Sequence, residues 1–561
     1  YFWDVMWLDS IYLLPLVILG VILLVRKGNL FLYPIAIASA VAVNYYIGFF
    51  VALFTALFFI SYLICVWPDL RTERSRPIRI AVLRTFQFVL MSALAAGITA
   101  FLSLPTWMAL QMTSAAGDSF PKNHKFEFTV LEFMTRHLIS MKPSIRDGLP
   151  NIYAGLISLL ALPLYVFNRR IRLREKVASL SLLAFLFLSF NSNYLNFIWH
   201  GLHYPNQLPY RYSFLYSFVL VIIAVRALMN LRYLKKGIAL GAGSLLIVVI
   251  VLAEVLFKDK VPPESVYVSI VFIVIYILAM RPRTRRRLSY SLAALFLCIM
   301  VLCESLVSSI LLLNQVGKNE GFTSHEGYTG DLAAVTNVIE AVKKNDPGFW
   351  RLEILPAKST DDPALYNYNG LTIFSSTVNK PTAQSMRNMG FHGNNINSYK
   401  YVNSTALTDM LFGIRYRISK NQSWNDPRWT NLAMTEIGVN VDGDKNPYLY
   451  KNDEALTPLW FIHEEPDSLR LRSQNAFENL QTLLTAADPS LSDVVNFQKI
   501  EVLSGLNVTP RAGSERNGYR FDLENNKKDT QVTVYIDVTE DSWQYFHIDT
   551  SRRTEIRVWR E

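Results

Sequence analysis

Residues 238–257 read IALGAGSLLIVVIVLAEVLF, twenty positions in which Glu254 is the one ionisable side chain. A helix of about 20 apolar residues crosses the hydrocarbon core of a bilayer, so this run predicts a membrane span. Comparable runs recur before and after it, and together they predict a bundle of about ten transmembrane helices. The expected spans are 11–25, 31–47, 49–67, 81–102, 152–167, 177–190, 213–228, 238–257, 266–280 and 288–313.

The composition divides the chain into two parts. Of the 561 residues, 51% are hydrophobic and only 18% are charged, which is too apolar for an ordinary soluble enzyme. Apolar runs dominate as far as Leu313, whereas polar and charged residues are spread from Asn314 onward as in a globular domain. We therefore expect a multi-span transmembrane domain over 1–313, followed by a water-soluble part.

Lys and Arg accumulate in alternate short loops between the apolar runs, which accounts for the net charge of +10 without a nucleic-acid partner. The positive-inside rule places these loops in the cytoplasm. They are 26–27, 71–79, 169–174, 232–236 and 281–287. The other connections, and everything after Leu313, are then expected to be extracytoplasmic. The three cysteines lie in apolar runs, so the soluble part has none for a disulfide, which favours a bacterial plasma membrane.

The soluble part is expected to contain two domains. A helical pattern at 332–344 precedes an alternating strand pattern at 349–355, which predicts an α/β domain over 314–465. Alternation returns at 531–538 and 545–549. We therefore expect a β-rich, sandwich-like domain over 466–561.

Polar residues gather at the predicted outer ends of the spans. Ionisable groups cost free energy at membrane depth, so such a gathering indicates a wet cavity. Asp9 lies at the outer mouth of the first span, where it is a candidate general base or metal ligand. Asp near a helix start is equally typical of a cap that accepts backbone N–H bonds, and both roles stay open.

The loop 191–214 is dense in hydrogen-bonding and aromatic side chains. Arg211 lies there on the outer side, against the positive-inside bias, and a guanidinium in that place suits a lipid phosphate. His200 and His203 could donate to the same phosphate or transfer protons. The alternative is an interfacial belt, with Tyr210 at headgroup level and Arg211 extending to the interface. A second long loop, 103–151, contains a segment at 126–139 that we expect to be an amphipathic helix along the interface.

Several motifs in order along the chain resemble the YfhO family of bacterial membrane proteins. They are MWLD at 6–9, NYYIG at 44–48, LPNIY at 149–153, HG at 200–201, LPYRYSF at 208–214, LFGIRY at 411–416 and NAFENL at 475–480. The resemblance implies a glycosyltransferase of the GT-C superfamily. Such an enzyme takes a sugar from a polyprenyl-phosphate carrier in the membrane and transfers it to an extracytoplasmic acceptor, such as lipoteichoic acid or a related cell-wall polymer.

Together, the loop residues and the resemblance assign expected roles to particular residues. Arg211 is expected to bind the donor phosphate, and the supporting substrate-binding residues are expected to be His200, His203, Asn44 and Tyr210. Asp9 is the catalytic candidate, and a divalent metal such as Mg²⁺ or Mn²⁺ is left open as a cofactor. The family's acidic residue of the first outer loop is expected upstream of Tyr1, and a closing span beyond Glu561, so the chain is expected to be a fragment.

Two other classes of function stay open. A flippase or transporter of lipid-linked sugars would place charges or broken helices near mid-membrane, where Glu254 and Glu304 are exceptions to otherwise apolar spans. A non-catalytic assembly protein would bind wall glycan through stacking rings. The candidate rings are Trp424, Trp429, Trp460 and Trp543.

Overall fold

The structure is a computed structural model of the chain. It describes all residues except 1–3, 74–76, 206, 236, 281–286, 395, 421–425, 440–446, 458–468, 470, 472–474, 497–499, 511–520, 525–528, 537–544 and 547–561. The chain forms two compact units: a helical unit of residues 1–111 and 115–322, and a C-terminal unit of residues 112–114 and 323–561. Helix α13 (Arg287–Glu320) runs through the expected boundary at residue 314.

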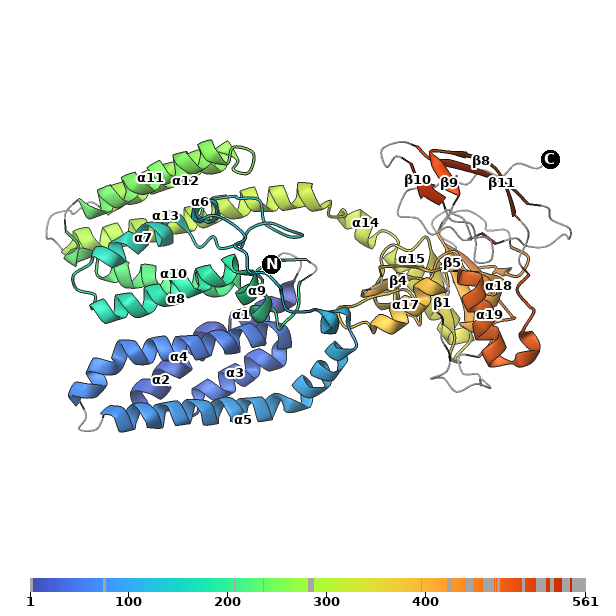
Figure 1. The fold of residues 1–561 in the computed structure, drawn as a ribbon, viewed down its shortest axis with the longest axis horizontal. Helices are drawn as coiled ribbons and strands as arrows, with labels where there is room; N and C mark the ends of the chain where they lie inside the picture. The colour runs from blue at the N-terminus through green and yellow to red at the C-terminus, as the bar shows by residue number, and fades with distance from the viewer. Residues whose placement is uncertain are drawn as a thin grey trace. The chain divides into compact units, whose positions relative to one another are not determined.

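The helical unit is built from helices alone, apart from its loops (Figure 1). Before α13 come α1 (Leu8–Ile11), α2 (Leu14–Lys27), α3 (Leu32–Val43), α4 (Tyr45–Glu73), α5 (Pro77–Gln111), α6 (Val130–Thr135), α7 (Leu156–Phe167), α8 (Leu173–Asn191), α9 (Asn193–Trp199), α10 (Ser213–Met229), α11 (Ile238–Leu256) and α12 (Pro263–Ala279). Short 3₁₀ turns occur at Val5–Trp7, Ser114–Gly117 and Leu231–Tyr233.

Each of the ten predicted apolar runs lies for the most part on a different helix, and these helices are α2–α5, α7, α8 and α10–α13. In the part of the chain that the structure describes, five helical stretches are long and apolar enough to cross a membrane. They are Val5–Lys27, Tyr45–Trp67, Pro77–Gln111, Ile238–Leu256 and Ser291–Lys318. Four apolar helices, α3, α7, α10 and α12, are shorter. The polytopic helical fold is therefore as expected, while the count of ten crossings stays a prediction.

The surface of the helical unit is apolar, and its helices pack closely through small residues. Phe101 and Leu302 are 78% and 70% exposed, which suits a surface that contacts lipid tails. Inside, a Cβ added to Gly20 of α2 would lie 2.7 Å from the Cα of Tyr33 in α3. Glycine at that position lets the two backbones approach, as is usual between membrane helices.

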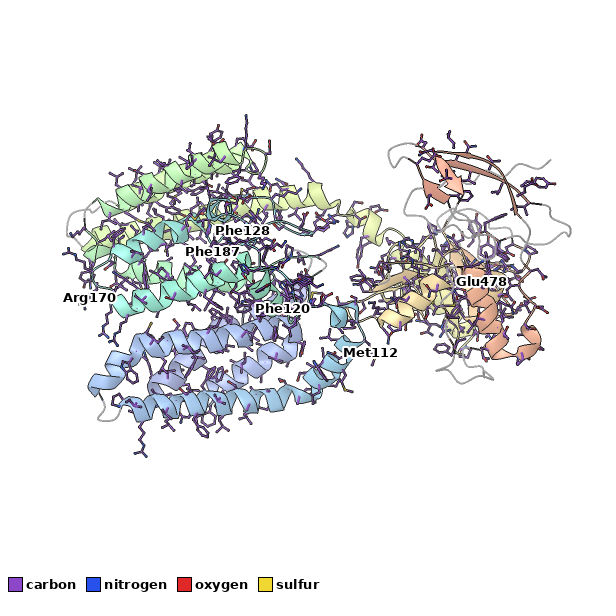
Figure 2. All side chains as sticks on the ribbon, in the orientation of Figure 1. Met112, Phe120, Phe128, Arg170, Phe187 and Glu478 are labelled. Carbon is purple, nitrogen blue, oxygen red and sulfur yellow. The ribbon has the colours of Figure 1, made fainter. Side chains whose placement is uncertain are left out.

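The two ends of the helical unit differ in their chemistry. Arg170, in the connection between α7 and α8, lies at one end, and Phe120 lies at the other (Figure 2). We call these the basic end and the polar end. The polar end comprises Asn44 and residues 118–155, 191–205 and 207–212.

The C-terminal unit is a mixed α/β structure. Its helices are α14 (His325–Thr329), α15 (Leu332–Asn345), α16 (Asp362–Leu365), α17 (Lys380–Asn388), α18 (Ala406–Leu411) and α19 (Ala476–Ala487). Its strands are β1 (Arg351–Leu355), β2 (Ile373–Phe374), β3 (His392–Gly393), β4 (Ser398–Lys400), β5 (Ile414–Ser419), β6 (Thr430–Leu432), β7 (Tyr448–Lys451), β8 (Ile500–Leu506), β9 (Val508–Pro510), β10 (Phe521–Leu523) and β11 (Gln531–Ile536).

One four-stranded sheet organises this unit, in the order β1-β5-β7-β6. Strands β1 and β5 are parallel and the other neighbours are antiparallel. The apolar face of α15, with Val338 and Ile339, packs against Leu352 and Ile354 of β1. The predicted helix at 332–344 is thus confirmed as α15, and β1 confirms residues 351–355 of the strand predicted at 349–355.

The β-rich domain is described only in part. Strand β11 confirms most of the predicted strand at 531–538, and it pairs with β8, while β9 pairs with β10. Most of the strand expected at 545–549 lies outside the described residues. The sandwich-like arrangement stays a prediction.

The amphipathic helix expected at 126–139 forms only in its central part. Helix α6 covers only Val130–Thr135, and a capping box between Thr129 and Glu132 starts it. The residues before it are extended because Phe126 forms a β-bridge with Ser192 of the loop after α8. A partner distant in the sequence therefore outcompetes the helical pattern.

Candidate functional site

Hydrogen bonds from side-chain amides connect the two long loops of the polar end. Asn191 Oδ1 accepts hydrogen bonds from the backbone N–H groups of Glu127 (3.0 Å) and Phe128 (2.9 Å). Asn193 Oδ1 accepts from Lys125 N–H (3.0 Å), and its Nδ2 donates to the Asn123 carbonyl (2.8 Å). These amides satisfy the backbone of a loop that has no sheet of its own, which gives the polar end a defined shape.

A buried arginine holds the second half of the same loop. Arg136 donates to the carbonyls of Lys142 (2.9 Å) and Pro150 (3.3 Å) and to Asn151 Oδ1 (2.8 Å). Asn151 in turn binds both the N–H and the carbonyl of Ser144, each at 3.0 Å. We call this arrangement the Arg136 clamp. It folds residues 136–151 into a compact lobe.

The loop before α10 has an unusual backbone conformation. Gly201, Leu202, Leu208 and Tyr210 all have positive φ, between 53° and 75°. Such conformations are costly for side chains larger than glycine and persist only where the surroundings impose them. One such contact is the N–H of Leu208, which donates to the Ile145 carbonyl at 2.5 Å. Strained backbone of this kind is typical of functional loops.

The loop presents Arg211 to two aromatic rings. Its Nε and Nη2 donate to the carbonyls of Leu208 (3.3 Å) and Gln207 (2.9 Å). Its guanidinium carbon lies 5.5 Å from the ring centre of Trp7 and 5.2 Å from that of Tyr46. Arginine therefore fixes a positive charge at the polar end, with cation–π contacts on helices remote in sequence.

The two predicted histidines lie beside this cation. The rings of His200 and His203 are 6.3 Å apart, and His203 is 6.3 Å from Tyr46. His200 is fully buried, and its Nδ1 lies 2.8 Å from the Asn196 carbonyl, so Nδ1 carries the proton. Burial, more than the nearby Arg211 charge, lowers the pKa of His200 to about 3. His200 is thus a neutral ring, and within the described structure its Nε2 has no hydrogen-bond partner.

The charge of Arg211 acts on the carboxyl of Asp4, a residue that the sequence analysis did not select. Burial raises the pKa of the Asp4 carboxyl, and the positive charge of Arg211 partly offsets that rise. Asp9 is exposed in the first turn of α1, a helix that has no side-chain cap in the described structure. A 3₁₀ turn, Val5–Trp7, follows Asp4, and no sequence motif distinguishes Asp4 from Asp9.

Two other predicted site residues have evident structural roles. Asn44 joins α3 to α4, and its Oδ1 accepts the N–H of Ile47 at 2.9 Å. Tyr210 is 6% exposed, with its ring against Phe128 and Phe190 rather than beside Arg211. The structure thus brings together Arg211, His200 and His203.

The described residues contain no group of three or more His, Cys, Asp or Glu side chains arranged to hold a metal ion. Around Arg211 and His203 the possible ligands include the carboxyls of Asp4 and Asp118 and two imidazoles, which are not arranged as a metal site. The chemistry proposed for this site therefore assigns no step to a metal.

Comparison with known proteins decides the family. The model of the family described as "Bacterial membrane protein YfhO" matches residues 1–559. The chain belongs to the YfhO family. No curated protein and no solved structure matches it. Because the YfhO match covers both units, the resemblance read from the motifs at 6–9, 44–48 and 208–214 is confirmed for the whole chain, as is its assignment as a membrane protein.

Among the rings considered for glycan stacking, the structure describes one. Trp429 is 5% exposed, and the Arg417 guanidinium lies 4.5 Å from its ring centre. This ring is part of the core of the C-terminal unit. Trp424, Trp460 and Trp543 lie outside the described residues.

Proposed function

We propose that this YfhO-family protein is a membrane glycosyltransferase of the GT-C type. It would take a sugar from a polyprenyl-phosphate carrier in the plasma membrane and transfer it to an extracytoplasmic acceptor, such as lipoteichoic acid or a related cell-wall polymer. In this proposal the polar end and the C-terminal unit face outward, since the basic connections belong to the cytoplasmic side.

The observation that supports the proposal best is the environment of Arg211. A fixed cation lies where α4 and α10 begin, with two aromatic rings and two histidines around it. A lipid-linked sugar phosphate is amphiphilic, so its phosphate has to be bound at the membrane interface while its tail stays in lipid. Arg211 is suited to that phosphate because charge-assisted hydrogen bonds from a guanidinium are strong and directional.

The proposed chemistry is one displacement. An acceptor hydroxyl attacks the anomeric carbon of the sugar, the bond from that carbon to the phosphate oxygen breaks, and polyprenyl phosphate leaves with the bonding electrons. A carboxylate takes the hydroxyl proton. Asp4 is the better placed of the two carboxyls at the start of the chain, because burial makes it more basic and Arg211 is near. Asp9 remains a candidate for orienting the acceptor.

Arg211 and the histidines would act on the leaving group. Arg211 offsets the charge that grows on the phosphate as the bond breaks. His203, half-buried beside it, can donate a hydrogen bond to the same oxygens, while the neutral His200 can accept one from a sugar hydroxyl.

Sugar transfer by membranes that contain the full-length protein tests the proposal. The substrate is a radiolabelled polyprenyl-phosphate sugar, and the product is label in an acceptor polymer. Arg211→Ala should abolish transfer, whereas Arg170→Ala at the basic end should leave it unchanged. Transfer at the wild-type rate by the Arg211 variant would refute the phosphate role.

A flippase for the same lipid-linked sugar is the second candidate, and one observation favours it. Glu304 is a buried carboxylate within the span Ser291–Lys318, and it binds the start of the short helix α7. Ionisable groups at interrupted helices are typical of transport sites. Movement of labelled sugar-lipid across proteoliposomes, without transfer to an acceptor, would support this alternative.

A further inference from the structure

Glu304 stands out among the carboxylates of the helical unit because it is 1% exposed and lies deep within α13. Burying a carboxylate among apolar helices is costly unless its oxygens receive hydrogen bonds. The proposed sugar transfer gives this residue no task.

Three donors converge on the Glu304 carboxylate. Its Oε1 accepts from the Tyr153 hydroxyl and from the Leu156 N–H, both at 2.6 Å, and its Oε2 accepts from the Tyr276 hydroxyl at 2.5 Å. These residues come from the loop before α7, from α7 itself and from α12. Glu304 therefore ties three separate segments to α13.

The bond to Leu156 replaces a missing helix cap. Leu156 is the first residue of α7, and the residue before it, Gly155, has φ +84° and no side chain that could bind the free N–H groups. A Cβ on Gly155 would lie 3.9 Å from both carboxylate oxygens. Glu304 thus supplies from α13 the acceptor that a capping side chain usually provides.

The capped helix is too short to span the membrane alone. Its 12 residues extend about 18 Å, against a hydrocarbon thickness of about 30 Å. The residues before it, including the fully buried Ile152, extend the chain beyond the start of α7 without helical hydrogen bonds. Such backbone is tolerated at membrane depth only when protein holds it, and Glu304 does so.

A continuous path of bonds leads from this carboxylate to Arg211. Asn151 lies two residues before Tyr153 and forms two hydrogen bonds with the backbone of Ser144. The next residue, Ile145, accepts the Leu208 N–H at 2.5 Å, and the Leu208 carbonyl accepts Arg211 Nε at 3.3 Å. We call this path the Glu304 relay.

We propose that Glu304 is a positioning residue for Arg211. It fixes the start of α7, and through the Glu304 relay it fixes the backbone that aims the guanidinium. Its importance for catalysis rests on the proposed function, but its effect on the loop does not. Because Glu304 lies on the helix that leads into the C-terminal unit, a shift of α13 would reach Arg211 by this path.

Hydrogen exchange of the full chain in lipid nanodiscs tests the relay. Glu304→Met keeps about the size of the side chain but removes both acceptor oxygens, and Glu254→Met on α11 is the matched control. Amides in residues 201–212 should exchange about tenfold faster in Glu304→Met and at the wild-type rate in Glu254→Met. Tyr153→Phe removes one of the two bonds to Oε1, so it should give a smaller rise in the same peptide if Glu304→Met does not fold.

Binding of polyprenyl phosphate to the same variants separates the relay from the proposed function. Faster exchange confined to α7, α12 and α13, with 201–212 unchanged, would overturn the relay and leave Glu304 as a structural cap. Faster exchange at 201–212 with unchanged phosphate binding would support the relay and count against the donor role of Arg211. Loss of phosphate binding with unchanged exchange at 201–212 would overturn the relay alone.

Discussion

The Arg211 guanidinium lies 5.2 Å from the ring centre of Tyr46, so a cation–π contact joins the loop before α10 to the first turn of α4. The contact joins residues more than 160 positions apart in the printed sequence. An ammonium group would not make the same contacts, because a planar guanidinium can stack on aromatic rings and donate two hydrogen bonds to oxygens at the same time.

Arg211→Lys should therefore weaken binding of polyprenyl phosphate, although the charge is kept. Arg211 uses two different nitrogens for the Leu208 and Gln207 carbonyls, whereas the three N–H groups of lysine all extend from a single nitrogen and cannot also fork onto a phosphate, so we expect a loss of about tenfold. Titration of nanodisc-embedded protein with polyprenyl phosphate measures the loss, and Arg170→Lys is the control. Equal affinity of the Lys variant would show that only the charge counts.

Acid should destabilise the helical unit through its buried histidines. Burial lowers the pKa of His137 to about 4 and that of His200 to about 3, below the ordinary 6.5. The unfolded chain therefore binds more protons than the folded chain below about pH 6.5, and stability falls as pH decreases toward these values, by up to about 1.4 kcal/mol per pH unit for each group.

The thermal unfolding midpoint between about pH 7.5 and about pH 5 measures this effect. His137→Gln and His200→Gln should each flatten the dependence, while the exposed His325→Gln should not. An unchanged slope in both buried variants would contradict the prediction.

Glu353 should give the C-terminal unit the opposite dependence. This carboxyl is 2% exposed, and burial raises its pKa to about 7 despite hydrogen bonds from Leu371 and Thr372. Because the folded pKa exceeds the ordinary 4.5, its contribution is full below about pH 4.5 and is lost as pH rises through 7. The loss amounts to about 3 kcal/mol.

The protection of the β1 amides, corrected for the intrinsic rise of exchange with pH, measures the stability of this unit within the full chain. Glu353→Gln should remove the fall in protection between about pH 5 and about pH 8, whereas Glu340→Gln at an exposed position of α15 should keep it. A fall in protection that persists in Glu353→Gln would place the titrating group elsewhere.

Gly20→Ala should separate α2 from α3. The new methyl would meet the Tyr33 backbone at 2.7 Å, and overpacking of this kind costs about 1–3 kcal/mol. Gly97 of α5 has nothing within 4 Å of the same added atom, so Gly97→Ala should be neutral or slightly stabilising. Thermal unfolding in nanodiscs compares the two variants, and equal midpoints would refute the close approach.

Hydropathy was sufficient to find the apolar helices because lipid imposes one simple requirement on every span. It placed the start of the fifth span at residue 152, four residues before α7 begins. That difference could not be predicted, because the helix begins where Glu304, about 150 residues later, supplies its cap. Likewise the helix expected at 126–139 lost its first part to a pairing with Ser192.

The candidate site was predictable in its chemistry but not in its geometry. The position of Arg211 at the end opposite the basic loops could be predicted from loop charges, and the neighbouring His200 and His203 came with it. The direction in which the Tyr210 ring points could not be predicted. Its φ is positive, and the ring lies against Phe128. Asp4 was missed because burial and the nearby Arg211 charge, rather than a sequence motif, distinguish it from Asp9.

The single residue between α3 and α4 has a consequence for biogenesis. Asn44 ends one helix and begins the next, with its carbonyl bound to the N–H of Gly48 at 2.8 Å. A connection of one residue leaves no slack for the two helices to enter the bilayer at different times. We therefore expect α3 and α4 to enter lipid together as one helical hairpin.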